Sequence, residues 1–415
     1  MSKIKYLYIQ FHASVFLLGY LLMHTVLSAI TGGASHGASI AFNGFMLVSS
    51  IYVMAICHGD IIIEHGKNFL NVFSIVMILY SLRMFFDIYS GPFSMIVPLK
   101  NMWDDFLRTV GGTFLPTWAI ISSRRYIDIE KISTLSFWFG LVTCLFTIYI
   151  LQTQGITSYE EGRVDLSSGL HSLSLVKLGA IEIIAALHVI INNKKKLIWF
   201  VGCLGLILGG FIALISGSRG GVVGVVIAIA VYIIMRNRKR PLLMLVSSIV
   251  VMIFIINIVP ILTWISDFFP VFGNRMLEAV IDMDTSNRDI LWEQAMGFIL
   301  ENPVLGYSYR LNTDLTGYGP HNGILEVALC LGIPIAALFV YYAYIKAFKY
   351  ATIMMLDHRY IFVSLITVFA IVSSMSSTSL SNGIFDFAIS IVGIAYYYSR
   401  RNLPKKYHIA NVKIL

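Results

Sequence analysis

Long, uninterrupted apolar runs are the feature that most restricts what this chain can fold into. Hydrophobic residues make up 57% of its 415 residues and charged residues only 13%, whereas soluble domains carry about 45–50% apolar and about 25% charged residues. This composition excludes a soluble globular enzyme, a disordered chain and a disulfide scaffold. A helix needs about 20 apolar residues to cross a bilayer, while barrel strands would show alternating segments of about 10 residues. The continuous runs therefore predict an all-α polytopic membrane protein.

We predict about twelve transmembrane helices in one integral membrane domain that covers residues 1–415. The predicted spans are 8–30, 38–57, 68–87, 105–122, 132–151, 169–191, 197–215, 220–235, 241–263, 321–345, 359–376 and 383–399. The Lys and Arg clusters fall in alternate loops, and the positive-inside rule places these loops in the cytoplasm. Both termini are therefore predicted to be cytoplasmic, and the first apolar run is interpreted as an uncleaved span. The net charge of +8 is assigned to orientation, and no nucleic acid partner is predicted.

One large loop, residues 264–320, is predicted on the outer, periplasmic face between spans nine and ten. Loops of this length are uncommon and are often functional. Within it, Ser286 and Asp289 have the spacing of a capping box. Five apolar residues then share one helical face: Trp292, Ala295, Met296, Ile299 and Leu300. This pattern predicts a short amphipathic helix against the membrane or the bundle, ended by Pro303 and Gly306.

Arg219 lies in the sequence Ser-Gly-Ser-Arg-Gly-Gly (216–221), between spans seven and eight. The predicted topology places it outside, against the positive-inside trend. Small residues and exposed amides beside a cation favour an anion-binding concavity, with Ser218 and Gly220 as substrate contacts. The alternative is a tight interhelical turn with a snorkelling arginine.

Two further residues of the outer face are candidates for chemistry. Arg288 falls in the first turn of the predicted loop helix, where unpaired amides and a planar guanidinium favour phosphate. Its alternative is an exposed arginine paired with Asp289 or Asp284. His321 begins the tenth span beside Asn322, which is a candidate substrate contact, and a histidine at this boundary moves a proton or binds phosphate. Its alternative is an interfacial polar residue after a helix-starting proline.

The remaining candidates are weaker. Arg163 lies on the predicted outer face and is a candidate substrate contact, although its acidic neighbours favour local charge pairing. Aromatic residues of the large loop stack on sugars or anchor the chain at the interface; they are Trp264, Tyr307, Tyr309 and Tyr318. Lys177 and Glu182 are candidates for an ion pair inside the bundle.

Several classes of site are not predicted. The four cysteines lie in or beside apolar runs without metal-ligand spacing, so neither a disulfide nor a zinc site is expected. No clustered Asp, Glu or His residues suggest another metal, and no glycine pattern for ATP or NAD occurs. The prediction is therefore a protein without metal and without cofactor.

Three stretches of the sequence resemble the superfamily of bacterial O-antigen polymerases and O-antigen ligases. They are Ser-Gly-Ser-Arg-Gly-Gly-Val-Val-Gly (216–224); Arg288-Asp289-Ile290-Leu291-Trp292 with the later Glu-Asn-Pro-Val-Leu-Gly (301–306); and His321-Asn322, followed after nine residues by Gly332. Their order and the large outer loop also match, over roughly residues 160–400. Ile335, three residues after Gly332, stands where some ligases carry a small residue or tyrosine, which favours a polymerase.

The resemblance implies a metal-independent glycosyltransferase of the bacterial inner membrane with a periplasmic active site. Arg219, Arg288 and His321 match the essential residues of the family. The implied partners are an undecaprenyl-diphosphate-linked oligosaccharide donor and acceptor, membrane lipid and, as a candidate, a chain-length regulator protein. The main interpretation is an O-antigen or related surface polysaccharide polymerase. The alternatives are a ligase that transfers the polymer to lipid A–core, a polysaccharide flippase or transporter, and a membrane scaffold without activity.

Overall fold

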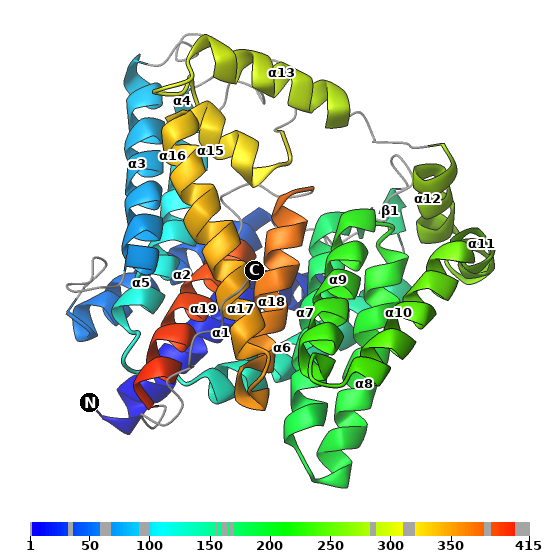
Figure 1. Ribbon diagram of the computed structural model, residues 1–415. Coiled ribbons are helices and arrows are strands. Elements are labelled where there is room, and N and C mark those ends of the chain that lie inside the picture. Colours follow the sequence, from blue (N-terminus) through cyan, green and yellow to red (C-terminus); the bar gives the residue numbers. More distant parts are fainter. Residues whose placement is uncertain are drawn as a thin grey trace.

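The computed structural model describes residues 2–31, 36–58, 68–90, 99–154, 156–158, 165–166, 170–282, 288–309, 320–376 and 383–402. They form a helical bundle (Figure 1). The first part contains α1 (Lys3–Thr31), α2 (His36–Ile56), α3 (Asn68–Ser90), α4 (Leu99–Phe106), the π-helical η1 (Leu107–Phe114), α5 (Leu115–Ser122), α6 (Ile129–Thr153) and α7 (Ser172–Asn192). The middle contains α8 (Lys196–Ile215), α9 (Arg219–Asn237), α10 (Pro241–Ile256), α11 (Ile258–Phe268), α12 (Pro270–Ile281) and α13 (Arg288–Glu301). The last part contains α15 (Gly323–Leu331), α16 (Ile333–Phe339), the π-helical η3 (Val340–Lys346), α17 (Ala347–Met354), the 3₁₀ segment η4 (His358–Tyr360), α18 (Ile361–Ser374) and α19 (Gly383–Asn402).

Among the described residues, seven helices are long and apolar enough to cross a membrane, or eight when the bent pair α10–α11 counts as one. They are α1, α2, α3, α6, α7, α8 and α9, and each coincides with a predicted span. The chain is therefore a multi-pass, all-helical membrane protein, as predicted. The predicted number of about twelve is not confirmed, because the other predicted spans fall on shorter or interrupted helices.

Three of these spans differ in form from the prediction. Span 105–122 falls on a helix with an internal π-helical segment, η1. Span 241–263 divides into α10 and α11, which meet at an angle of 68°. Span 321–345 is interrupted at Gly332, whose φ of +83° separates α15 from α16. Hydropathy reports apolar length but not backbone direction, so it does not distinguish straight from broken helices.

The predicted loop 264–320 contains more helix than the sequence suggested. The predicted helix is present as α13, but it is not amphipathic, because Met296 and Leu300 of the predicted apolar face are exposed; α11 and α12 precede it in the described part of the segment. A short antiparallel pair of strands also occurs between α6 and α7, where β1 (Ile156–Ser158) pairs with β2 (Asp165–Leu166). The sequence analysis predicted neither feature.

The core is centred on α18 and α19, whose described side chains are buried on nearly every side. Around them, α9 packs against α18, α7 packs against α6 and α8, and α1 packs against α6. By contrast, α10 exposes large apolar side chains such as Leu242 (72%) and Val250 (59%). A helix that is apolar all round suits a lipid environment.

Polar contacts hold the helix turns together at the end of the bundle where the N-terminus lies. Asp128 accepts a hydrogen bond from Tyr6 (2.6 Å) and caps α6 by accepting from the amide of Lys131 (3.2 Å). Burial raises the pKa of Asp128, but the hydrogen bonds and charge from Tyr6 and Lys131 outweigh burial and lower it. These contacts stabilise the ionised carboxylate.

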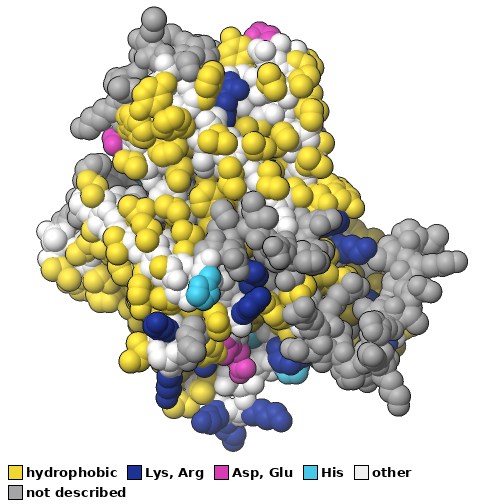
Figure 2. Space-filling view, turned by 90° about the vertical axis from the view of Figure 1, so that its left-hand side faces the viewer, with side chains coloured by type: hydrophobic (Ala, Val, Ile, Leu, Met, Phe, Trp, Pro, Cys, Tyr) yellow, Lys and Arg dark blue, Asp and Glu magenta, His cyan; other side chains and the backbone are white. Residues whose placement is uncertain are grey.

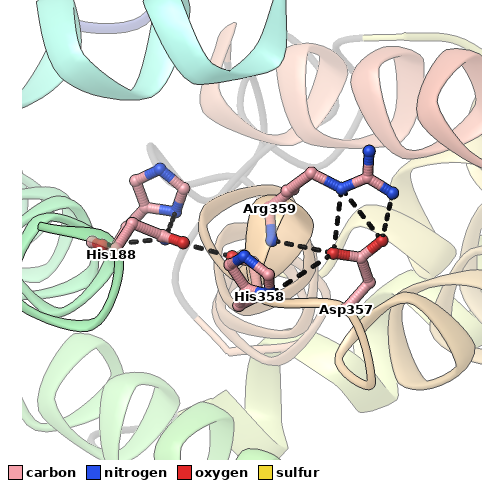
Figure 3. A network of polar contacts seen from close by, with 5 residues as sticks. His188, Asp357, His358 and Arg359 are labelled. Atoms are coloured by element: carbon pink, nitrogen blue, oxygen red, sulfur yellow. Dashed lines mark hydrogen bonds and ion pairs between the residues drawn. The ribbon is translucent and has the colours of Figure 1, made fainter.

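A second network at the ends of α7 and η4 joins distant segments (Figure 3). The side chain of Asn192 donates to the backbone carbonyl of His358 (3.1 Å) and to that of His188 (3.0 Å). Arg359 donates to Asp357 through Nε and Nη2, with a shortest distance of 2.6 Å. Burial raises the pKa of Asp357, but hydrogen bonds and charge from Arg359 lower it overall. The network ties η4 to the end of α7.

The two ends of the bundle differ. On the face shown in Figure 2, hydrophobic side chains cover the middle and upper parts, while Lys and Arg side chains gather toward the lower end. In Figure 1, α13 lies across the upper end, opposite the N-terminus. The elements with the predicted site residues start or end near this upper side, which separates them from the basic turns.

Candidate functional site

The turn between α8 and α9 places Arg219 at the first position of α9. Gly217 in this turn has a φ of +68°, a left-handed conformation that favours glycine. The hydroxyl of Ser216 donates to the carbonyl of Ala213 (2.7 Å) and accepts from the amide of Ser218 (3.2 Å). The backbone therefore favours glycine at position 217, and hydrogen bonds of the Ser216 hydroxyl hold the turn.

Arg219 contacts an arginine that the sequence analysis did not single out. Its Nη1 donates to the backbone carbonyl of Arg275 in α12 (2.9 Å), and Nη1 of Arg275 donates to the carbonyl of Gly217 (3.1 Å). Arg275 is buried, with 9% of its surface exposed. Two guanidinium side chains thus lie at one turn, and each holds the backbone that carries the other.

Arg288 is the first residue of α13 and is half-buried. The helix spans Arg288–Glu301, so Arg288 lies in its first turn and it ends before Pro303, as predicted; Asp289 also lies in the first turn. Of the predicted apolar face, Ala295 and Ile299 are buried, whereas Met296 and Leu300 are 48% and 67% exposed. Ser286, the predicted cap, lies outside the described residues.

His321 is tied to α13 through its neighbour in the chain. Nε1 of Trp292 donates to the carbonyl of Pro320 (2.9 Å). Trp292 follows Arg288 by four residues and therefore lies on the same face of α13, about one turn away. This bond places the first turn of α13 over the start of α15, so the structure brings the elements of Arg288 and His321 together.

The backbone of His321 adopts a left-handed conformation, with a φ of +48°. Such conformations in non-glycine residues cost about 1–3 kcal/mol and persist where the surroundings impose them. Here Asn322 caps α15 by accepting from the amides of Ile324 (3.0 Å) and Leu325 (3.2 Å). Its Nδ2 also donates to the carbonyl of Met375 (3.2 Å) at the end of α18. Asn322 therefore has a structural role, and its predicted substrate contact stays a prediction.

Two glycines from the resembling stretches, Gly306 and Gly332, pack against each other. The amide of Ile333 donates to the carbonyl of Pro303 (2.7 Å), and the amide of Tyr307 donates to the carbonyl of Leu329 (2.6 Å). Gly306 has a φ of +73°, and a Cβ there would lie 2.5 Å from the carbonyl carbon of Cys330. The segment after α13 thus docks into the break between α15 and α16.

Helix α3 supports the same segment from the other side. Arg83 donates to the carbonyls of Leu305 (3.3 Å) and Tyr307 and to the carboxylate of Asp87 (2.9 Å). Asp87 in turn accepts from the amide of Tyr309 (3.0 Å). No role for Arg83 or Asp87 was predicted from the sequence. Their partners lie more than 200 residues away, which sequence spacing does not reveal.

The other predicted residues are placed as follows. Ser218 is buried and precedes α9, Gly220 lies in its first turn, and Tyr307 packs its ring 6.1 Å from that of Phe298. Arg163 and Tyr318 lie outside the described residues. Trp264 is 64% exposed on α11, next to Phe268.

The structure also tests the predicted ion pair between Lys177 and Glu182. Within the described residues, no ion pair joins Lys177 to Glu182, so that predicted pairing is wrong. The carboxylate of Glu182 is buried and packs against the α6 and α8 backbones near Gly140 and Gly205.

A cavity of about 440 Å³ lies at the other end of the molecule, beside Tyr6 and Arg124, and none of the predicted site residues lines it.

Trp292→Phe tests the link between α13 and His321. The phenylalanine keeps an aromatic ring but removes the donor to the Pro320 carbonyl, and such a bond contributes about 0.5–1.5 kcal/mol. We expect turnover in a glycan-transfer assay to fall about three- to tenfold. The exposed Trp199→Phe in α8 is the matched control and should leave turnover unchanged; equal losses in both variants would contradict the link.

Comparison with known families matches residues 204–340 to the family described as O-antigen ligase. The matched range runs from α8 to the start of η3 and includes Arg219, Arg275, Arg288 and His321. No curated protein matches the chain. Members of the matched family are enzymes of surface polysaccharide biosynthesis. Residues 204–340 of this multi-pass membrane protein are therefore similar to the O-antigen ligase family, which supports the resemblance to the ligase and polymerase superfamily.

Proposed function

We propose that this protein is an O-antigen, or related surface polysaccharide, polymerase. It transfers a growing glycan from undecaprenyl diphosphate to a lipid-linked repeat unit. The observation that carries the proposal is two separate sets of contacts around the motif residues of the family-matched domain. Arg219 and Arg275 meet at the α8–α9 turn, while Trp292 joins the helix of Arg288 to the segment of His321.

The proposed topology puts this chemistry in the periplasm. The turns after α7 and α9 carry Lys194–Lys196 and Arg238–Arg240, and the positive-inside rule assigns such turns to the cytoplasm. Because α8 and α9 run between those turns and Arg219, the latter faces the opposite side. The protein then lies in the inner membrane with cytoplasmic termini.

A sugar diphosphate already contains a good leaving group, so the enzyme has two tasks. It must orient two lipid-anchored substrates, which supplies up to about 7–11 kcal/mol, and stabilise charge on the diphosphate, for which each fixed cation supplies a few kcal/mol. Arg219 and Arg288 are proposed to clamp the diphosphate from separate elements. Ser218, Gly220, Arg163 and the aromatic Tyr307 and Tyr318 are proposed substrate contacts.

The reaction then follows a direct displacement. An acceptor hydroxyl oxygen bonds to the anomeric carbon of the donor sugar while the bond from that carbon to the diphosphate oxygen breaks. Undecaprenyl diphosphate leaves with the electron pair, and the two arginines stabilise its charge. The hydroxyl proton passes to His321; in the alternative role, His321 contacts phosphate and the proton passes to solvent.

Reconstitution tests the proposal. The substrate is the lipid-linked repeat unit that accumulates in cells lacking the gene, added to purified protein in liposomes with and without lipid A–core. We expect undecaprenyl-linked products of two or more repeats and release of undecaprenyl diphosphate. Glycan on lipid A–core alone would identify a ligase, and movement of the substrate across the bilayer without transfer would identify a flippase.

The same assay tests metal independence. Because guanidinium groups replace a metal ion as the partner of the diphosphate in this proposal, turnover should persist in excess EDTA. A loss that Mg²⁺ or Mn²⁺ restores would contradict the arginine clamp.

A further inference from the structure

Arg275 is a buried cation with no motif to mark it in the sequence. It lies in α12, which packs against α11 and meets the bundle at α8 and α9. Only 9% of its surface is exposed, although arginine is almost never fully buried unless it is paired. Polar contacts must therefore compensate for the burial of Arg275.

Those contacts are directed at the turn that carries Arg219. Nη1 of Arg275 donates to the carbonyl of Gly217 (3.1 Å), and the carbonyl of Arg275 accepts from Nη1 of Arg219 (2.9 Å). Gly217 has the left-handed φ of +68° on which the turn depends. One residue of α12 thus holds both the backbone before Arg219 and the guanidinium of Arg219.

The two hydrogen bonds between Arg275 and the α8–α9 turn restrict the orientation of the Arg219 guanidinium. An arginine side chain has many rotamers, and holding it in one of them costs conformational free energy. The bond from Nη1 of Arg219 to the Arg275 carbonyl fixes one nitrogen of the guanidinium, and because the group is planar this bond also restricts the plane of the group. A planar group fixed at one nitrogen is suited to two-point contact with phosphate oxygens.

We infer that Arg275 is a positioning residue, which locks α12 onto the α8–α9 turn and thereby orients the guanidinium of Arg219 toward a diphosphate. This inference rests on the proposed function, because it takes the diphosphate as the ligand of Arg219. Arg275 acts through Arg219 in this assignment and does not itself contact the substrate.

A double-mutant cycle on diphosphate binding tests the inference. The probe is geranylgeranyl diphosphate, and its affinity is measured for the purified full-length protein in detergent. Arg275→Met should weaken binding about 10- to 100-fold, because a hydrogen bond from a charged donor is lost and the turn is released. Arg275→Lys should recover part of the affinity, since an ammonium group still donates to the Gly217 carbonyl. The matched control is Asn274→Ala, an exposed neighbour in α12.

The diagnostic variant is Arg219→Ala combined with Arg275→Met. If Arg275 acts through Arg219, the double variant should bind the probe within about twofold of Arg219→Ala alone. Full additivity, or unchanged binding by Arg275→Met, would overturn the inference while the proposed function stands. Unchanged binding by Arg219→Ala would instead refute the proposed function, and the inference with it.

A second variant covers a folding failure of Arg275→Met. Gly217→Ala strains the same turn from its other side, because alanine disfavours the left-handed φ. It should reproduce the loss of affinity, and combined with Arg219→Ala it should bind the probe within about twofold of Arg219→Ala alone. Gel filtration and thermal unfolding of each variant separate a loss of fold from a loss of orientation, and normal probe binding by folded Gly217→Ala would contradict the inference.

Discussion

Arg219→Ala is expected to reduce glycan transfer about 10²- to 10³-fold in a protein that still folds and inserts into the membrane. Removing one fixed charge-stabilising group from an active site costs about 3–4 kcal/mol of transition-state stabilisation. Arg219 begins α9 and is half-buried at the turn to α8, so its loss removes a group that the turn has already oriented. The measurement is turnover of the purified variant with a lipid-linked repeat unit.

Arg219→Lys distinguishes charge from shape at this position. Lysine keeps the positive charge but provides a point charge in place of a planar fork, so most of the activity should still be lost. It also loses the geometry of the bond to the Arg275 carbonyl. Full activity in Arg219→Lys would show that charge alone suffices and that two-point recognition of the diphosphate is wrong.

The matched control lies just after the other end of α9. Arg238 follows α9 at its other end and is exposed among basic residues. Arg238→Ala removes an equal charge from the chain and should leave turnover unchanged. Equal losses in Arg219→Ala and Arg238→Ala would trace the effect to net charge or insertion rather than to a diphosphate site.

Hydropathy and local motifs predicted much of the architecture. Seven predicted spans coincide with long apolar helices, and Arg288 lies in the first turn of α13, as predicted. These successes have a physical basis, because crossing a bilayer demands apolar length and a helix start demands particular residues near its first turn. Both requirements are local in the sequence.

The errors and omissions concern contacts between distant segments. Gly332 breaks the tenth predicted span because the segment around Val304 docks into it, and nothing near Gly332 in the sequence shows that partner. Arg275 lies within a segment interpreted as loop, so it carried no motif. Arg83 and Asp87 gained their roles from backbone groups more than 200 residues later.

The candidate site shows the same division. Motifs identified Arg219, Arg288 and His321, but the residues that hold them in place were found only from the fold. Trp292 illustrates this point: its helical spacing predicted an apolar contact, whereas its indole nitrogen bonds to the carbonyl before His321. Spacing along a helix predicts which face a side chain occupies but not which polar partner it finds.

Gly332→Ala is expected to destabilise the folded protein by at least about 2–4 kcal/mol and to abolish glycan transfer. Gly332 has a φ of +83°, and a Cβ there would overlap the carbonyl of Val304 and lie 3.0 Å from the amide nitrogen of Gly306. All of these neighbours are backbone atoms, so no side chain can rotate to make room. The variant must undock the segment after α13, which shifts Arg288 and His321 relative to each other. Thermal unfolding in detergent and the transfer assay measure the two effects.

Gly297→Ala in α13 is the matched control, because a Cβ there meets no atom within 4 Å. Alanine at this position should be neutral or stabilise that helix by up to about 1 kcal/mol. Wild-type stability and activity in Gly332→Ala would show that the docking of residues 303–306 onto the α15–α16 break does not organise the site.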